Sequence, residues 1–189
     1  MKNIAVFVSG SGSNAENLYR YFEHSPVARV TVMLSNKPDA YALVRANNLG
    51  LESIVFARDD FRNSDRVLDE LKKRGVDYIV LAGFLWLVPD NLIRAYRGRI
   101  LNIHPALLPK YGGKGMYGEN VHRAVIEAGE KESGITIHQV NEKYDSGDIV
   151  FQAKVELTSD DTPESCAAKI HALEYEYFPK IVEQEILKS

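Results

Sequence analysis

The sequence predicts an α/β protein built on a mostly parallel, twisted sheet with helices on both faces. Short runs rich in β-branched residues alternate with longer stretches whose apolar residues recur every three to four positions, as in stacked βα units. The run Ile79-Val80-Leu81-Ala82 is apolar without interruption, which indicates a strand buried on both faces. The chain has 189 residues, 45% of them hydrophobic and 26% charged, and shows no internal repeat or flexible linker. We therefore expect one domain, residues 1–189.

The elements are expected in the order β-α-β-α-β-α-β over the first part of the chain. The four apolar runs predicted as strands are Ile4–Val8, Val30–Leu34, Ser53–Phe56 and Tyr78–Ala82. The helices predicted between them are Asn14–His24, Asp39–Leu49 and Ser64–Arg74, the last two ending at Gly50 and Gly75. Three further strands and a closing helix are predicted at Ile100–Ile103, Gly134–Val140, Ile149–Val155 and from about Thr162 to the end. Ligands of such sheets bind beyond the carboxyl ends of the strands, so the residues after each strand are candidate site residues.

Charge and cysteine content narrow the classes of function. The 23 Lys+Arg and 26 Asp+Glu give a formal charge of −3, so no overall field attracts nucleic acid or an anionic membrane. The single cysteine, Cys166, allows no intrachain disulfide and suits a reducing compartment. The apolar run Ile4–Val8 is too short for a signal-peptide core or a membrane span, so a cytoplasmic protein is expected. The five histidines show no ligand spacing with cysteine, and no metal site is expected.

A glycine-rich loop follows the first predicted strand and reads Ser9-Gly10-Ser11-Gly12-Ser13-Asn14. Glycines there let a phosphate approach the backbone, and the helix that follows offers free N–H groups. The alternative is a tight turn in which Ser13 or Asn14 caps the helix. Gly10–Ala15 also matches a loose dinucleotide fingerprint, but no acidic residue ends the second strand, which favours a monophosphate over NAD.

Asn102 and His104 form the candidate catalytic pair. In a strand, residues two apart project to the same side, so an amide and an imidazole would face one reacting centre. The alternative is a structural histidine at a strand end. A carboxylate such as Asp145, on a turn-forming stretch, would raise the imidazole pKa and orient the ring if the fold placed it beside His104.

The combined motifs resemble the 10-formyltetrahydrofolate-dependent formyltransferases. The resemblance lies in the Gly10–Asn14 loop and in four runs: Leu81-Ala-Gly-Phe84, Asn102-Ile-His104-Pro, Leu107-Leu-Pro-Lys-Tyr111 and Asp145-Ser-Gly147. It covers nearly the whole chain and implies a Rossmann-like sheet. It is strongest to the branch of the family that transfers a formyl group to the amine of glycinamide ribonucleotide in de novo purine (IMP) biosynthesis.

The resemblance also implies roles for individual residues. Asn102 and His104 would stabilise the oxyanion, and Asp145 would keep His104 charged and relay a proton through water. The expected contacts to the phosphate and ribose come from Gly12, Ser13, Asn14 and Glu174. The expected folate contacts come from Leu85, Trp86, Leu87, Val88, Asn102, Val140, Asn141 and Glu142. The partners would be these two small molecules alone, with 10-formyltetrahydrofolate as co-substrate, no metal, and a monomer or homodimer as the assembly.

The resemblance further implies a phosphate-binding half, about residues 1–100, and a folate-binding and catalytic half, about residues 101–189. Two features depart from the family pattern. Ser64 occupies the position of an arginine near the folate tail, with Arg62 and Arg66 close by, and the loop Gly112–Gly118 is longer and richer in glycine. We expect this loop to be a mobile flap over the site. The alternatives left open are a sugar-nucleotide formyltransferase, a formyltetrahydrofolate deformylase and a dinucleotide-binding oxidoreductase.

Overall fold

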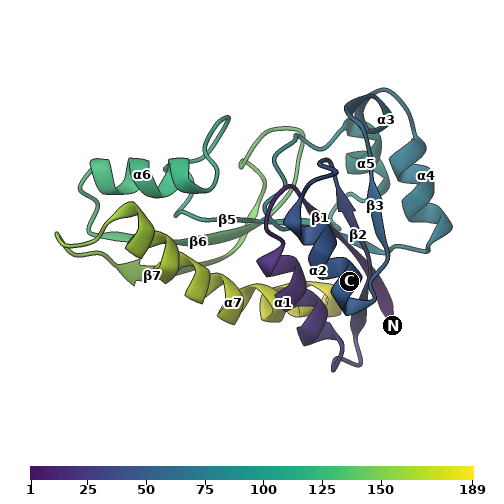
Figure 1. Ribbon diagram of the computed structural model, residues 1–189, viewed down its shortest axis with the longest axis horizontal. Helices are drawn as coiled ribbons and strands as arrows, with labels where there is room; N and C mark the ends of the chain where they lie inside the picture. Colours follow the sequence, from purple (N-terminus) through teal and green to yellow (C-terminus); the bar gives the residue numbers. More distant parts are fainter.

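The computed structural model describes residues 1–189 and contains one seven-stranded sheet in the order β3-β2-β1-β4-β5-β6-β7 (Figure 1). The strands are β1 (Lys2–Val8), β2 (Ala28–Ser35), β3 (Ser53–Val55), β4 (Tyr78–Leu81), β5 (Ile100–His104), β6 (Glu132–Gln139) and β7 (Ile149–Glu156). The first five strands in the sheet order are parallel, β6 is antiparallel to β5, and β7 is antiparallel to β6. The predicted mostly parallel α/β sheet is confirmed.

Helices cover both faces of this sheet because the central strands are apolar on both sides. The helices are α1 (Ser13–Phe22), α2 (Tyr41–Leu49), α3 (Arg58–Arg62), α4 (Arg66–Lys73), α5 (Asp90–Ala95), α6 (Glu119–Glu127) and α7 (Pro163–Leu187). In β1, Ile4, Val6 and Val8 point into one core, shared with α1, α2, α6 and α7. Ala5 and Phe7 point into the other core, shared with α3, α4 and α5.

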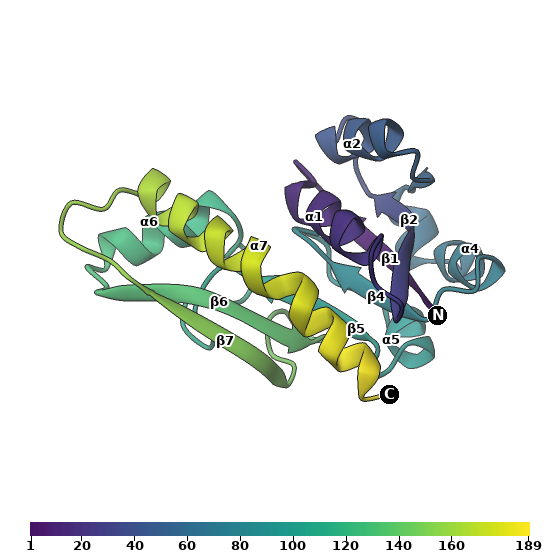
Figure 2. The ribbon, with the colours of Figure 1, turned by 90° about the horizontal axis from the view of Figure 1, so that it is seen from below.

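The long helix α7 packs against the antiparallel part of the sheet and against α1. Figure 2 shows it lying along β6 and β5 and reaching α1. Its start follows the prediction closely: Thr162 caps the helix, its side chain accepts a hydrogen bond from the N–H of Ser165, and Pro163 occupies the first turn. At the other end, Tyr21 of α1 donates a hydrogen bond to Glu183 at 2.7 Å. The C-terminal helix of the chain therefore lies alongside α1, near the N-terminus.

Three helices were missed by the sequence prediction, namely α3, α5 and α6. Two of them, α3 with five residues and α5 with six, are too short for helical periodicity to stand out from the flanking loops, and α6, with nine, directly follows the glycine-rich loop Gly112–Gly118. The boundaries of the predicted elements also shift. Ser64 lies before α4 rather than in it, and Val140 lies beyond β6, where its N–H donates to the carbonyl oxygen of Ile100 at 2.9 Å.

None of the helices combines the length and apolar character that a membrane crossing requires.

Candidate active site

The loop between β1 and α1 presents unpaired backbone N–H groups at the start of a helix. Gly12 is the N-cap of α1 with φ 77°, and no side chain caps the helix. The N–H groups of Gly12, Ser13 and Asn14 make no hydrogen bond within the chain. The alternative in which Ser13 or Asn14 caps the helix is wrong. The loop instead has the free donors and the positive end of a helix dipole that an anion needs.

Asn14 is connected to the far end of the chain through Glu174. The Asn14 amide Nδ2 donates to Glu174 Oε2 at 3.2 Å, while Asn14 Oδ1 is buried with no partner. Glu174 on α7 is only 5% exposed, and its other oxygen lies 2.8 Å from Nδ1 of His171. The structure thus brings together two of the residues expected to hold the phosphate and ribose, although 160 positions separate them in the sequence.

Asn102 and His104 project from the same side of β5, as their spacing predicts. The antiparallel register places Asn102 opposite His138 and His104 opposite Thr136 of β6. His104 is 3% exposed, and its Nε2 lies 2.7 Å from the carbonyl oxygen of Tyr111. Because a carbonyl oxygen only accepts, Nε2 carries a proton and donates it there. The other ring nitrogen, Nδ1, is the one that faces the site.

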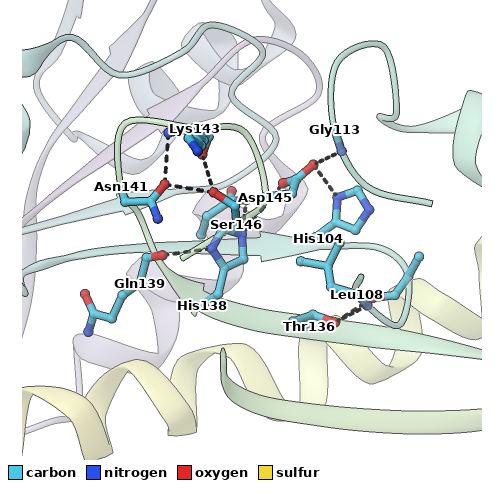
Figure 3. A network of polar contacts seen from close by, with 12 residues as sticks. His104, Leu108, Gly113, Thr136, His138, Gln139, Asn141, Lys143, Asp145 and Ser146 are labelled. Atoms are coloured by element: carbon cyan, nitrogen blue, oxygen red, sulfur yellow. Dashed lines mark hydrogen bonds and ion pairs between the residues drawn. The ribbon is translucent and has the colours of Figure 1, made fainter. Parts of the chain in front are cut away.

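Asp145 lies beside His104, with Oδ2 3.5 Å from Nδ1 of the imidazole (Figure 3). The same oxygen accepts a hydrogen bond from the N–H of Gly113 at 3.0 Å. Asp145 itself has φ 49°, a left-handed conformation that Asp tolerates better than most residues. The contact between Asp145 and His104, which the sequence alone could not show, is therefore present in the fold.

The position of the Asp145 turn depends on Gly147. A Cβ on Gly147 would lie 1.6 Å from the carbonyl oxygen of Gln139. Only glycine allows the turn to pass this close to the end of β6. Within the turn, Asn141 Oδ1 accepts hydrogen bonds from the N–H of Lys143 at 2.9 Å and from the hydroxyl of Ser146 at 3.0 Å (Figure 3).

The ionisation of the pair differs in one respect from the expectation. Burial lowers the pKa of His104, and the Asp145 carboxylate and the Tyr111 carbonyl offset this only in part. Asp145 acts in the expected direction, although burial outweighs it here, and its role in keeping the imidazole charged during the reaction stays a prediction. Burial acts to raise the pKa of Asp145, but the His138 and His104 rings and the Gly113 N–H outweigh it, and the pKa is lowered. Asp145 is the anion of the site.

His138 is a site residue that the sequence analysis missed. Its Nδ1 lies 2.9 Å from the carbonyl oxygen of Gln139 and therefore donates to it. Its Nε2 is then an acceptor for the Asn102 amide Nδ2 at 3.0 Å. The same Nε2 lies 3.7 Å from Asp145 Oδ1. His138 thus orients the amide of Asn102 while leaving the second amide N–H free. The alternation of Thr136 and His138 along β6 was the available signal, but it becomes informative only once the pairing with β5 is known.

The residues expected to hold the folate are divided between a cleft and the core. Leu87, Val88 and Glu142 line a cleft of about 600 Å³ together with Arg62, Ser64 and Arg94. Part of the stretch after β4 and part of the stretch after β6 thus line the same cleft. Trp86 instead packs against Phe56, Phe61 and Phe84, and the N–H of Leu85 donates to the Ser9 hydroxyl at 3.0 Å.

Val140 packs on the core shared with α3, α4 and α5, and Asn141 supports the Asp145 turn. Glu142 forms an ion pair with Arg97 at 3.2 Å. Of the two arginines near Ser64, Arg62 faces the cleft, whereas Arg66 pairs with Asp60 at 3.2 Å and lines a separate small pocket.

The segment from Gly112 to Gly118 leads from Tyr111 into α6. Gly113 contacts Asp145, so the start of this segment is attached to the site. Its expected mobility remains a prediction.

No group of three or more His, Cys, Asp or Glu side chains has an arrangement that could hold a metal ion.

Comparison with known proteins shows similarity over nearly the whole chain. A family model described as formyl transferase matches residues 2–182. A phosphoribosylglycinamide formyltransferase of Bacillus subtilis is 35% identical over 189 residues, covering 97% of this chain and 94% of the relative. A chloroplastic phosphoribosylglycinamide formyltransferase of Arabidopsis thaliana is 42% identical over 187 residues, or 96% of this chain. The chain spans 64% of the length of that plant protein and 60% of its relative from Vigna unguiculata.

Solved structures also match this chain over nearly its whole length. A crystal structure of glycinamide ribonucleotide transformylase 1 from Symbiobacterium toebii superposes with a TM-score of 0.91 at 32% identity, covering 100% of this chain and 89% of the other. A phosphoribosylglycinamide formyltransferase from Bacillus halodurans gives a TM-score of 0.86 at 33% identity, covering 97% and 94% of the two chains.

Proposed function

The chain belongs to the formyl transferase family, and from this premise we propose that it transfers the formyl group of 10-formyltetrahydrofolate to the amine of glycinamide ribonucleotide. The observation that carries the proposal is the meeting of Asn102, His104 and Asp145 at the sheet edge that also bears the free N–H groups of the Gly12 loop. This reaction requires two hydrogen-bond donors for an oxyanion and an anchor for a phosphate, and both lie at the carboxyl ends of the parallel strands.

In the reaction, the substrate amine attacks the formyl carbon and the carbonyl oxygen becomes an oxyanion. Asn102 donates its second amide N–H to that oxygen, since His138 accepts the first. His104 donates from Nδ1, because its Nε2–H is committed to Tyr111. The oxyanion and Asp145 then place two negative charges beside the ring, which favours the imidazolium despite burial. Removing one such donor typically costs about 3 to 4 kcal/mol of transition-state stabilisation.

The proton balance needs no separate strong base. An α-amino group ordinarily has a pKa of about 8, so part of the substrate amine is unprotonated at neutral pH. After attack, a new nitrogen–carbon bond forms and the bond from the formyl carbon to the folate nitrogen breaks. The attacking amine loses one proton and the leaving folate nitrogen gains one. We assign this relay to Asp145, acting through water.

Folate would lie in the cleft lined by Leu87, Val88 and Glu142, with Arg62 and Arg94 near its tail, and its formyl end would reach from the cleft to Asn102. The phosphate and ribose would contact Gly12, Ser13, Asn14 and Glu174. In this proposal residues 1–100 mainly hold the phosphate, and residues 101–189 supply the catalytic groups. We propose a cytoplasmic enzyme that acts as a monomer or homodimer, which light scattering of the purified chain over a concentration series would distinguish.

An absorbance assay for folate release tests the proposal, with glycinamide ribonucleotide and 10-formyltetrahydrofolate each omitted in turn. We expect turnover only when both are present, and loss of most turnover in a folded His104→Ala variant. His24→Ala is the matched control, because it changes an exposed histidine that is distant from His104 in the sequence, and it should keep full turnover. Turnover without the ribonucleotide would indicate a deformylase. Absence of turnover with detectable NAD(P)H binding would indicate an oxidoreductase, and turnover only with a sugar nucleotide would indicate that branch.

A further inference from the structure

The loop that precedes α1 is held from behind by the neighbouring helix α2. The carbonyl oxygen of Gly10 accepts a hydrogen bond from the N–H of Ala42 at 3.1 Å, and the carbonyl oxygen of Ser11 accepts one from Nε of Arg45 at 2.8 Å. A Cβ on Gly12 would lie 2.5 Å from the Cβ of Ala42, so the loop and the helix are in close contact. Two successive carbonyl groups of the loop therefore point toward α2.

The direction of these carbonyls determines where the loop's donors point. In a trans peptide the C=O of one residue and the N–H of the next face opposite ways. With the Gly10 and Ser11 carbonyls turned toward α2, the N–H groups of Ser11 and Gly12 face away from it. The Gly12 N–H is one of the unpaired donors at the start of α1. The orientation of this donor thus depends on the group that fixes the Ser11 carbonyl.

Arg45 is itself fixed in place by three contacts. Its Nη1 lies 2.8 Å from Glu16 Oε2 on α1, and the guanidinium lies over the ring of Tyr41, 5.0 Å from its centroid. Together with the Ser11 contact, these connect α1, α2 and the loop through one side chain that is 27% exposed. Glu16 has a second partner, Arg20, at 3.3 Å, but Arg20 is 63% exposed and does not contact the loop.

We propose that Arg45 is a positioning residue for phosphate recognition, which turns the Gly12 N–H toward the substrate phosphate by holding the Ser11 carbonyl. This inference rests on the proposed function, in which the Gly12 loop holds the phosphate of the ribonucleotide. It assigns to Arg45 an indirect role: the guanidinium faces the back of the loop, and its contribution passes through the peptide plane between Ser11 and Gly12.

The test compares Arg45→Met with Arg20→Met, which removes the other ion pair of the same glutamate. For Arg45→Met we expect KM for glycinamide ribonucleotide to rise about tenfold or more, the factor associated with losing one charge-assisted hydrogen bond. We expect kcat at saturation and KM for 10-formyltetrahydrofolate to stay within about twofold. Arg20→Met should change none of the three. Unchanged KM values in Arg45→Met, or an equal rise in both, would overturn the proposal.

Glu16→Gln separates positioning from simple attraction between charges. This change removes a negative charge near the loop and weakens one of the three contacts that hold Arg45. If Arg45 acted only as a positive charge, phosphate binding would tighten. If it acts by positioning, binding should weaken, although less than in Arg45→Met. Tighter binding would refute the assignment.

Calorimetric binding of ribose 5-phosphate makes the test independent of turnover. We expect the wild-type chain and Arg20→Met to bind it alike, and Arg45→Met to bind it about tenfold more weakly. Should the wild-type chain not formylate glycinamide ribonucleotide, the proposed function fails while this comparison still decides the role of Arg45. A wild-type chain that does not bind ribose 5-phosphate, or equal affinities in all three proteins, would overturn the positioning role.

Discussion

Replacing Gly147 by alanine should displace the catalytic carboxylate without touching a catalytic side chain. The new Cβ would lie 1.6 Å from the carbonyl oxygen of Gln139 and 2.7 Å from its carbon. Gln139 is held by the sheet, since it is the last residue of β6 and pairs with Leu101 of β5, and the N–H of Val140 donates to the carbonyl oxygen of Ile100 at 2.9 Å. The turn that carries Asp145 must therefore move, rather than the end of β6.

The size of the effect follows from this geometry. An ordinary contact between carbon and oxygen is about 3.3 Å, so the turn must shift by roughly 1.7 Å. Asp145 Oδ2 now lies 3.5 Å from His104 Nδ1 and 3.0 Å from the Gly113 nitrogen, and a shift of that size disrupts both contacts. A misplacement of about 1 Å in an active site can cost about 100-fold in rate. The accompanying strain should lower the free energy of unfolding by about 1 to 3 kcal/mol.

The assay is the folate-release measurement, fitted for kcat and for both KM values, together with thermal unfolding. We expect kcat to fall by about 100-fold while the protein remains folded. Gly129→Ala is the control, because Gly129 follows α6 and a Cβ there meets no atom within 4 Å. It should lower stability slightly, because Gly129 has φ 68°, and leave kcat unchanged. A Gly147→Ala variant with normal kcat would refute the argument that this close approach positions Asp145.

The contacts of Asp145, of His138 and of the His171–Glu174 pair each give one further prediction. Asp145→Asn should lower kcat by more than it raises either KM, and a normal kcat would remove Asp145 from the mechanism. His138→Leu should lower kcat about tenfold or more because the Asn102 amide loses the acceptor that orients it, whereas an unchanged rate would show that Asn102 needs no such support. The hydrogen bond to Glu174 raises the pKa of His171, so its stabilising contribution is complete below the unfolded pKa and is lost as the pH rises through the folded value. Chemical denaturation should therefore show a larger stability difference between wild type and His171→Asn at about pH 5.5 than at about pH 8.5, and a difference independent of pH would contradict this.

The long elements could be predicted from sequence because each carries its own periodicity. The run Tyr78–Ala82 is apolar throughout, and the strand lies in the middle of the sheet. Thr162 and Pro163 mark the start of α7 within one residue. The short helices α3 and α5 carry too few turns for such a signal, and the packing against the sheet stabilises them.

The candidate site was predictable to the extent that its residues follow strand ends or share a motif. Asn102 and His104 are two residues apart in one strand, so the period of a strand alone places them on one side. Their catalytic role, like the roles of the phosphate and folate residues, remains a prediction. His138 and Arg45 escaped detection because neither lies in a motif; each acts through a contact between separate elements.

The sequence by itself determined the α/β class, the family and the identity of the polar residues at the strand ends. These depend on local periodicity and on short motifs, which are properties of the sequence and require no folded structure. Only the tertiary structure decided which of those residues meet. The antiparallel pairing of β5 with β6 places His138 against Asn102, and α7 carries Glu174 to Asn14. It also decided the protonation behaviour of His104, because burial, which outweighs the attraction of Asp145 here, is a property of the packed chain and has no counterpart in any local pattern.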